Sequence, residues 1–304
     1  MVDLIPGSVG VVVVNYGSSA LLAANLVPLG RSMPEARVVV VDNLTSAEER
    51  SAVIALAEAE GWSVELPDSN TGFGVGVNLG AVRALGDGAD WLLILNPDAT
   101  IEASAVRQLV ARASAAPLTL VCPRIVRPDG STWFDGADLH LADGRLRNPR
   151  HRPADGWEPW LTGACLVASR RLWELVGGFD DDYFLYWEDV DLSHRVLLAG
   201  GAVEVCDDIV ATHAEGGTQG EGHASAGLRK SDTYYYFTIR NRLLFAGKHL
   251  DDDGLRRWLG NAHAVAWETL LQGGRRQFLH SLSPLFAARR ALRDGRRLAR
   301  VNRV

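Results

Sequence analysis

The stretch WLLILNPDAT, residues 91–100, decides how this chain is expected to fold. Apolar residues between turn-forming residues are typical of a β-strand that is buried on both faces. The strand ends at Asn96-Pro97-Asp98, because proline lacks the backbone N–H that the next hydrogen bond of the sheet would need. Asp98 is therefore expected just beyond the carboxyl end of a parallel strand, which is the edge at which open α/β sheets bind ligands.

Asp98 has two possible roles at that edge. A carboxylate held by a rigid strand can bind a divalent metal ion, which in turn can bind a diphosphate. Alternatively, Asp98 only caps a helix that begins near Glu102. The spacing is compatible with both interpretations.

Three more stretches of the strand type precede this one. Residues 9–16 (VGVVVVNY) and 37–42 (RVVVVD) are rich in valine, and residues 62–66 alternate like a short strand. A helix pattern follows each of them. This alternation within residues 9–116 predicts an α/β fold with a doubly wound, mostly parallel sheet.

Polar residues end three of these strands. They are Asn15 with Tyr16, Asp42 with Asn43, and Asn96 with Asp98. Because the carboxyl ends of parallel strands meet at one edge of the sheet, this recurrence predicts a ligand site there.

Residues 68–78 (DSNTGFGVGVN) hold alternating glycines before a helix pattern. The dinucleotide-binding pattern G-x-G-x-x-G is not met, because Leu79 stands where a match from Gly74 needs its last glycine. A nicotinamide-dependent enzyme is therefore not expected. The glycines allow a ligand to approach a helix N-terminus, with Asn70 and Asn78 supplying amide groups. A tight turn alone would explain the glycines but not the asparagines.

Residues 180–195 (DDDYFLYWEDVDLSHR) combine aromatic and acidic side chains where an extended segment turns into a helix. Asp191 and Arg195 are expected to pair along that helix. Asp189 differs, because the aromatic residues before it can form an apolar wall for a polyol, and its carboxylate can take a proton from a hydroxyl nucleophile. His213 follows another extended run. A lone histidine is usually structural, but beside a suspected metal site imidazole is a suitable ligand.

The composition excludes several classes of protein. The 304 residues are 47% apolar and 22% charged, and no apolar run approaches the roughly 20 residues that span a bilayer. The start of the sequence lacks the features of a signal peptide. Cys122, Cys165 and Cys206 lie far apart in apolar segments, as reduced core residues do. We therefore expect a cytoplasmic protein.

Charge is unevenly distributed along the chain. Of 31 basic and 37 acidic residues, residues 275–304 hold nine arginines and one acid, which leaves 22 basic and 36 acidic residues for the rest. The acidic body would repel nucleic acid. The basic tail predicts peripheral contact with an anionic membrane through a helix that carries Leu285, Ala288, Leu292 and Leu298 on one face. Packing of this face on its own domain, or on a second subunit in a homodimer, is the alternative.

The chain resembles inverting glycosyltransferases of the GT-A fold, family 2, in the branch similar to bacterial rhamnosyltransferases. The likeness covers residues 8–245. It rests on six segments in that family's order and approximate spacing: VVVVNYGSS, VVVDN, DSNTGFGVGVN, WLLILNPDA, LTGACLVASRRLWELVGGFDDDYFLYWEDVDLSHR and ATHAEGGT. Such enzymes pass a sugar from a nucleoside diphosphate donor to a hydroxyl group with inversion.

The resemblance implies a domain organisation. Residues 1–245 would form the GT-A catalytic domain, with a nucleotide-sugar-binding half at 1–116 and an acceptor and catalytic half at 117–245. Residues 246–304 would form a helical extension that ends in the basic tail.

The resemblance also assigns roles to individual residues. Asp189 matches the catalytic base of the family's Glu-Asp motif, Asp98 matches the metal-binding acid of its D-x-D motif, and His213 resembles an additional metal ligand of some members. The donor-binding residues would be Asn15, Tyr16, Asp42, Asn43, Asn70, Gly72, Asn78, Asn96 and Asp98, with Asp42 at the nucleobase. The pocket for the sugar and acceptor would be lined by Trp160, Thr162, Gly163, Trp187 and Glu188.

One position departs from the family pattern. Asn96 stands where the first acid of D-x-D is found. Its neutral amide removes a charge, which lowers the expected affinity for the Mg²⁺ or Mn²⁺ cofactor and makes a strict metal requirement less certain.

The implied reaction is a single displacement in which Asp189 takes the proton of the attacking hydroxyl group. The donor would be a dTDP- or UDP-sugar, with dTDP-rhamnose as the first expectation. The acceptor would be a lipid-linked glycan, a surface polysaccharide or a natural product. Two alternatives are a non-catalytic nucleotide-sugar-binding scaffold on the same fold and a sugar nucleotidyltransferase. The latter would need a basic, Gly-rich loop after the first strand, where this chain has Asn-Tyr-Gly-Ser-Ser.

Overall fold

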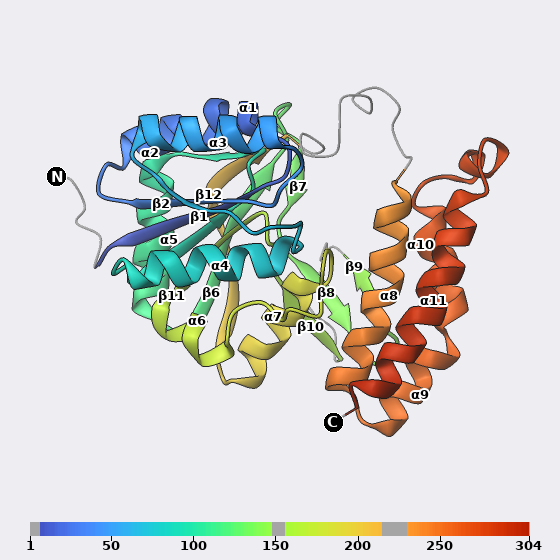
Figure 1. Cartoon of the computed structure of the whole chain (residues 1–304). Helices are drawn as coiled ribbons and strands as arrows, with labels where there is room; N and C mark the ends of the chain where they lie inside the picture. Colours follow the sequence, from blue (N-terminus) through green and yellow to red (C-terminus); the bar gives the residue numbers. More distant parts are fainter. Residues whose placement is uncertain (1–6, 148–155, 215–229, 304) are drawn as a thin grey trace. The chain divides into compact units, whose positions relative to one another are not determined.

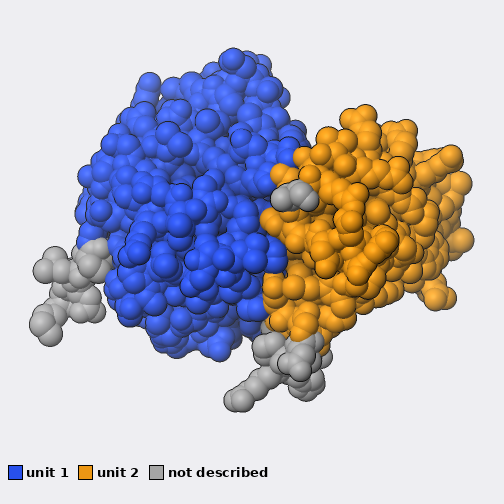
Figure 2. Space-filling view, turned by 90° about the horizontal axis from the view of Figure 1, so that it is seen from below, with its two compact units in different colours: residues 1–137, 159–184, 188–221 blue, residues 138–158, 185–187, 222–304 orange. Residues whose placement is uncertain are grey.

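The computed structural model describes residues 7–147, 156–214 and 230–303, and Figure 1 shows their helices and strands. The chain divides into two compact units, which Figure 2 colours separately. Unit 1 consists of residues 1–137, 159–184 and 188–221, and unit 2 consists of residues 138–158, 185–187 and 222–304. The division into nucleotide and acceptor halves that the resemblance implies stays a prediction.

Among the described residues, unit 1 is built on a nine-stranded sheet. Its strands run in the order β3 (Ser63–Glu65), β2 (Arg37–Asp42), β1 (Val9–Asn15), β4 (Trp91–Leu95), β11 (Cys165–Ser169), β6 (Thr119–Val126), β12 (Ala202–His213) and β5 (Ala99–Ile101), with β7 (Thr132–Phe134) beside β6. Neighbours among β1 to β4 are parallel, as are β6 and β12, whereas β11, β5 and β7 are antiparallel to their neighbours. The predicted mostly parallel sheet is therefore confirmed.

Helices cover both faces of this sheet (Figure 1). They are α1 (Ser19–Leu21), a π-helical turn (Leu22–Leu26), α2 (Val27–Ser32), α3 (Ala47–Glu60), α4 (Phe73–Gly86), α5 (Ala103–Ala115), α6 (Arg170–Val176) and α7 (Glu188–Leu198). Every residue of β1 and of β4 is buried. The valine and leucine runs thus form strands because both faces of each strand remove apolar surface from water.

Glycines of α4 let this helix pack closely on β1. A Cβ atom at Gly80 would lie 2.5 Å from Cγ1 of Val12, and one at Gly76 would lie 3.0 Å from Cγ1 of Val14. At Gly74 the added atom would lie 3.0 Å from Cβ of Phe179. The alternating glycines therefore serve chain packing, a role that the sequence pattern did not reveal.

The region after Asp98 differs from the sequence expectation. The short strand β5 follows Asp98, and α5 begins only at Ala103, with Glu102 at the N-cap position. Asp98 is therefore not a helix cap. After Gly201 the chain forms the single strand β12, whose register against β6 shifts between Cys206 and Val210.

Unit 2 contains four α-helices and a small sheet in its described part. The helices are α8 (Asp232–His249), α9 (Asp252–Gly260), α10 (Ala262–Leu271) and α11 (Ser283–Val301), with a 3₁₀ turn (Arg275–Leu279) before α11. The sheet has the order β10 (Trp157–Trp160), β8 (Ala137–His140) and β9 (Arg145–Arg147). Asn261 separates α9 from α10.

Part of the predicted apolar face of the C-terminal helix is buried within unit 2. Ala288 and Leu292 are 4% and 7% exposed. Small residues bring α11 against α8, since a Cβ atom at Gly247 would lie 2.5 Å from Cα of Ala299. One side of α11 therefore packs on the chain's own domain, and contact of this helix with a membrane stays a prediction.

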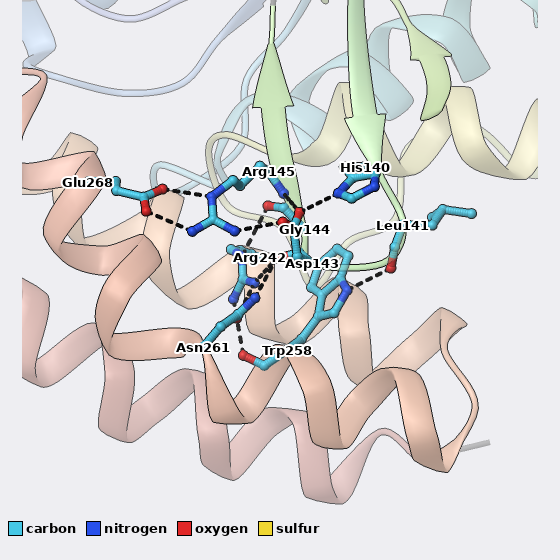
Figure 3. Close-up of polar contacts among 9 residues, drawn as sticks. All are labelled: His140, Leu141, Asp143, Gly144, Arg145, Arg242, Trp258, Asn261 and Glu268. Atoms are coloured by element: carbon cyan, nitrogen blue, oxygen red, sulfur yellow. Dashed lines mark hydrogen bonds and ion pairs between the residues drawn. The ribbon is translucent and has the colours of Figure 1, made fainter. Parts of the chain in front are cut away.

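The turn between β8 and β9 is anchored to the helices of unit 2 (Figure 3). The buried Arg242 of α8 donates to the carbonyl of Gly144 at 3.1 Å, and Asn261 donates to the carbonyl of Asp143 at 2.9 Å. Trp258 Nε1 donates to the carbonyl of Leu141 at 2.8 Å. These hydrogen bonds explain why residues 138–147 group with helices that follow them by about a hundred positions.

Within the described ranges, no helix is both long and apolar enough to cross a bilayer. The three cysteines are buried and unpaired, as the sequence predicted.

Candidate functional site

Polar side chains gather where β1 and β2 end. Asn15 and Asp42 are completely buried, and Asn15 Nδ2 lies 3.2 Å from Asp42 Oδ1. The other oxygen of Asp42 pairs with Arg50 Nε at 2.9 Å. Tyr16 is 46% exposed beside them and is free to contact a ligand through its ring. The contact of Asp42 with a nucleobase stays a prediction, and Arg50 is a partner that sequence reasoning missed.

The loop before α4 is held by asparagine side chains. Asn43 donates to the carbonyl of Gly72 at 2.7 Å and accepts from the N–H of Thr71 at 3.0 Å. Asn70 accepts from the N–H of Gly72 at 2.9 Å. Asn78 donates to the carbonyl of Phe179 and accepts from its N–H, at 2.7 and 2.9 Å. These hydrogen bonds give Asn70 and Asn78 a structural role. Contact of either side chain with the donor stays a prediction.

Asp98 and His213 lie together, as the sequence predicted. Antiparallel pairing places His213 of β12 opposite Ala99 of β5, the residue after Asp98. Nε2 of His213 is 3.0 Å from Oδ1 of Asp98, and both side chains are buried. The ring of Trp133 lies 4.4 Å from the imidazole, centroid to centroid. Trp133 is a further residue that the sequence analysis did not select.

These two side chains suit a divalent cation that takes its remaining ligands from a substrate. Within the described part of the chain, no group of three or more His, Cys, Asp or Glu residues could hold a metal ion. However, Mg²⁺ is commonly held by one or two carboxylates together with phosphates and water. Apart from the 3.0 Å approach of His213 Nε2, the buried Oδ1 of Asp98 accepts no hydrogen bond, and the amide of Asn96 lies 3.5 Å from His213 Nε2. The residues present therefore fit a weakly held Mg²⁺ or Mn²⁺ ion.

Asp189 lies in the first turn of α7 with both carboxylate oxygens bound to backbone donors. Oδ2 accepts from the N–H of Gly163 at 3.1 Å, and Oδ1 accepts from the N–H of Val190 at 2.9 Å. Burial raises the pKa of Asp189 to about 6, although both N–H groups act in the opposite direction. Such a carboxylate is charged near neutral pH and is basic enough to accept a proton.

Glu188 beside it has a different environment. Its side chain is 5% exposed, and Oε2 has no hydrogen-bond partner. Burial, together with the nearby charge of Asp189, raises the pKa of Glu188 well above its usual range. The pair therefore separates into a neutral carboxylic acid, Glu188, and a carboxylate, Asp189.

Residues 163 and 164 connect the two acidic positions of unit 1. The N–H of Asn96, two residues before Asp98, donates to the carbonyl of Ala164 at 2.9 Å. The adjacent Gly163 donates to Asp189. One short segment, residues 163 and 164, therefore links Asp98 and His213 to Asp189, although these residues are remote along the chain. The segment lies beside the end of β4.

The residues predicted for the sugar pocket do not all belong to the same unit. Thr162 and Gly163 belong to unit 1, as does Trp160, whose ring lies 5.7 Å from that of Phe134. Trp187 belongs to unit 2, where its ring lies 5.6 Å from that of Phe245. A role for any of these side chains in binding the sugar stays a prediction.

The backbone before Glu188 is unusual. Tyr186 and Trp187 have φ angles of 64° and 75°, a conformation that costs non-glycine residues of order 1–3 kcal/mol each. The completely buried Asn241 of α8 donates to the carbonyls of Leu185 and Tyr186 at 2.9 and 2.7 Å. Sequence analysis missed Asn241, and its only signal was an amide among the apolar residues of a helix.

Three comparisons relate this chain to known proteins. A family model described as "Glycosyltransferase like family 2" matches residues 6–233. The chain is 30% identical over 203 residues to an N-acetylglucosaminyl-diphospho-decaprenol L-rhamnosyltransferase of Mycobacterium tuberculosis, covering 57% of this chain and 66% of that protein. It is 23% identical over 219 residues to the dTDP-rhamnosyl transferase RfbF of Shigella flexneri, covering 70% of this chain and 71% of that protein.

A solved structure supports the fold. The chain superposes on GalNAc-T7 with UDP, GalNAc and Mn²⁺ with a TM-score of 0.60 and 14% identity, over 93% of this chain and 56% of that one. The expected GT-A fold is therefore confirmed.

Proposed function

This chain belongs to glycosyltransferase like family 2, in its rhamnosyltransferase-like branch, and from that premise we propose that it transfers a deoxyhexose, with rhamnose first, from a nucleoside diphosphate to a hydroxyl group with inversion. The observation that supports this reaction is the linkage of Asp98, His213 and Asp189 through residues 163 and 164. A base and a cation-binding pair near one strand end are what a single displacement requires.

Asp189 is the proposed base. As the acceptor oxygen attacks the anomeric carbon, its proton moves to the Asp189 carboxylate, and the bond to the diphosphate breaks on the opposite face. The N–H groups of Gly163 and Val190 fix the orientation of this carboxylate, so that it needs little reorganisation to accept the proton. One base is sufficient, because inversion needs no covalent intermediate.

Asp98 and His213 are the proposed holders of Mg²⁺ or Mn²⁺. When bound there, the ion would stabilise the negative charge that develops on the leaving diphosphate. The neutral side chain of Asn96 leaves one protein carboxylate at this position. We therefore propose that the donor's phosphates supply much of the coordination and that binding of metal and donor depend on each other.

The proposed donor is dTDP-rhamnose, with UDP-sugars as the second choice, and the proposed acceptor is a lipid-linked glycan. Both rest on the similarity to two relatives, one a dTDP-rhamnosyl transferase and the other an N-acetylglucosaminyl-diphospho-decaprenol L-rhamnosyltransferase. The proposed location is the cytoplasm, with peripheral contact at the inner face of the membrane where such an acceptor would be found.

Calorimetric titration with dTDP-rhamnose and UDP-N-acetylglucosamine, with Mn²⁺ or with a chelator, tests the proposal. We expect dTDP-rhamnose to bind more tightly and Mn²⁺ to strengthen its binding. Asp98→Ala should weaken binding at least about tenfold with Mn²⁺, by analogy with the loss of a metal's supporting residues, but not with chelator. The matched control is Asp208→Asn, an exposed acid of β12.

If Asp98→Ala binds the donor with Mn²⁺ as tightly as the parent chain does, Asp98 does not hold the metal. If the chain binds neither nucleotide sugar, the proposed donor class is contradicted. Slow release of free rhamnose from dTDP-rhamnose by the parent chain would separate an enzyme from a scaffold that only binds the donor.

A further inference from the structure

A groove of about 1180 Å³ lies between α10 and α11 in unit 2. Its most buried lining residues are apolar: Ala266, Leu270, Ala288 and Leu292. The packing of α11 on α8 buries one face of this helix, so the groove is formed by another part of its surface. Any ligand of the groove therefore meets apolar surface without displacing α11 from its own unit.

Arginines border the groove on the side of α11. Arg289, Arg293, Arg296 and Arg300 follow one another at intervals of three or four residues, so they form one stripe along the helix. Asp294 is the single acid of α11 and pairs with Arg293 at 2.9 Å. No carboxylate of a described residue pairs with Arg289, Arg296 or Arg300. This stripe thus carries positive charge that the chain itself leaves largely uncompensated.

Aromatic side chains are exposed at the same groove. Trp267 of α10 is 48% exposed and Phe286 of α11 is 67% exposed, and both line it. The Trp267 ring is stacked on Phe278 at 5.6 Å between centroids. Single exposed apolar residues are ordinary on protein surfaces. Here they adjoin a stripe of arginines, and that combination is typical of segments that lie at a membrane interface.

We propose that this groove is a docking surface for the anionic headgroups of a lipid bilayer. The guanidinium groups would contact lipid phosphates, while the Trp267 and Phe286 rings would enter the boundary between headgroups and acyl chains. A lipid surface fits better than nucleic acid, because the exposed rings need apolar surroundings and the rest of the chain has 36 acidic against 22 basic residues. The proposal is independent of which sugar is transferred.

Co-sedimentation of the full chain with vesicles tests this surface. We expect binding to phosphatidylcholine vesicles that contain phosphatidylglycerol, little binding to phosphatidylcholine alone, and weaker binding as salt is added. The triple variant R289Q/R296Q/R300Q should lose affinity by on the order of 10²-fold, since each arginine near an anionic surface contributes about 1 kcal/mol. Phe286→Ser should lose roughly tenfold, because a largely exposed ring no longer leaves water on binding.

The matched control changes three exposed arginines outside the groove: R171Q/R256Q/R257Q. This control should bind vesicles like the parent chain, apart from a small effect of net charge. An unchanged thermal shift with dTDP-rhamnose and Mn²⁺ in both triple variants shows that each is folded with an intact donor site. That measurement also keeps a failure of the lipid proposal distinct from a failure of the proposed transfer reaction.

Three results would overturn the proposal. The first is no binding of the parent chain to anionic vesicles. The second is an equal loss of binding in the two triple variants, which would indicate a general charge effect. The third is a change of oligomeric state in R289Q/R296Q/R300Q, measured by light scattering, with vesicle binding unaffected, which would make the groove an interface between copies of this chain.

Discussion

The strand-end edge of unit 1 and the segment 184–189 both present acidic side chains, but different interactions hold them in place. At the edge, Asp42 is the last residue of β2 and Asp98 lies in the turn after β4, and the sheet itself brings them to one side. In the segment, two residues adopt left-handed backbone conformations before Asp189. Their partners come from other parts of the chain, among them Asn241 on α8.

The two regions differ in which part of the sequence determines their structure. Strand ends are determined by short apolar runs and the turn residues after them. A strained backbone exists only where distant groups over-determine it. We therefore expect the edge to respond mainly to changes in its own residues, and the segment to respond to changes far away in the sequence as well.

The largest expected effect comes from the segment's own acid. Asp189→Asn keeps the shape of the side chain but removes the base, so turnover should fall by on the order of 10²-fold or more. Donor affinity, measured calorimetrically, should stay near that of the parent chain. The exposed Asp208→Asn is the control and should retain activity. Near-normal turnover in Asp189→Asn would refute the assignment of the base.

A single glycine distant from the segment should have the next largest effect. Gly72 has a φ of 88°, and a Cβ atom there would lie 2.2 Å from the backbone oxygen of Phe184. Gly72→Ala should lower the free energy of unfolding by about 2–4 kcal/mol, because strain and a backbone clash add. Gly61 also has a positive φ, of 71°, but open space beside it.

The control Gly61→Ala should therefore lose only about 1–2 kcal/mol, the cost of the backbone conformation alone. Urea unfolding of the two variants measures this difference. Equal losses would show that the contact with Phe184 contributes nothing, and the segment would then depend less on remote residues than we infer.

Asn241→Ala should destabilise the segment by removing a different set of hydrogen bonds. It leaves the carbonyls of Leu185 and Tyr186 without their donor, which should cost about 1–3 kcal/mol of stability. If the segment positions Asp189, kcat should fall while calorimetric donor affinity remains unchanged. The control is Gln272→Ala, which should leave kcat unaffected. It removes a hydrogen-bond partner of the Tyr234 hydroxyl group, and Tyr234 lies on the same helix as Asn241. A loss of stability without a change in kcat would confine Asn241 to a structural role.

The smallest effect is that of pH on the parent chain. The pKa of Asp189 is raised to about 6, mainly by burial. A base works in its deprotonated form, so the rate should be nearly independent of pH above 7. It should be about half-maximal near pH 6 and fall roughly tenfold per pH unit below that. Donor affinity measured over the same range separates this loss from weaker metal binding at low pH, because metal ligands must be deprotonated. A rate that remains constant down to pH 4.5 would contradict the inferred environment of Asp189.

The contrast also explains what could be predicted from the sequence. The four strand–helix units and the strand-end acids follow from local patterns, and the structure agrees with them. The proximity of Asp98 and His213 was suggested by the resemblance and arises from the pairing of β12 with β5. The short strand β5 was missed, because three residues after a turn carry no periodicity. The anchoring of Asn70 and Asn78 was also missed, because their partners cannot be inferred from neighbouring residues.

The C-terminal region shows the same limit. The resemblance implied a helical extension, and the apolar residues of α11 were expected either at a membrane or packed on the chain's own domain. A buried helix face and a membrane-binding face have the same sequence pattern. The close approaches of Gly247 to Ala299 and of Gly295 to Arg240 show which side of α11 packs on α8.

The anchored turn between β8 and β9 has a practical consequence for dissecting this protein. A fragment that stops at residue 245 would keep Arg242 but lose Trp258 and Asn261. The carbonyl of Leu141 would then lack its donor, and the carbonyl of Asp143 would keep Arg242 but lose Asn261. Expression of an isolated catalytic piece should therefore give a protease-sensitive product, because a portion of its fold is encoded downstream of the cut.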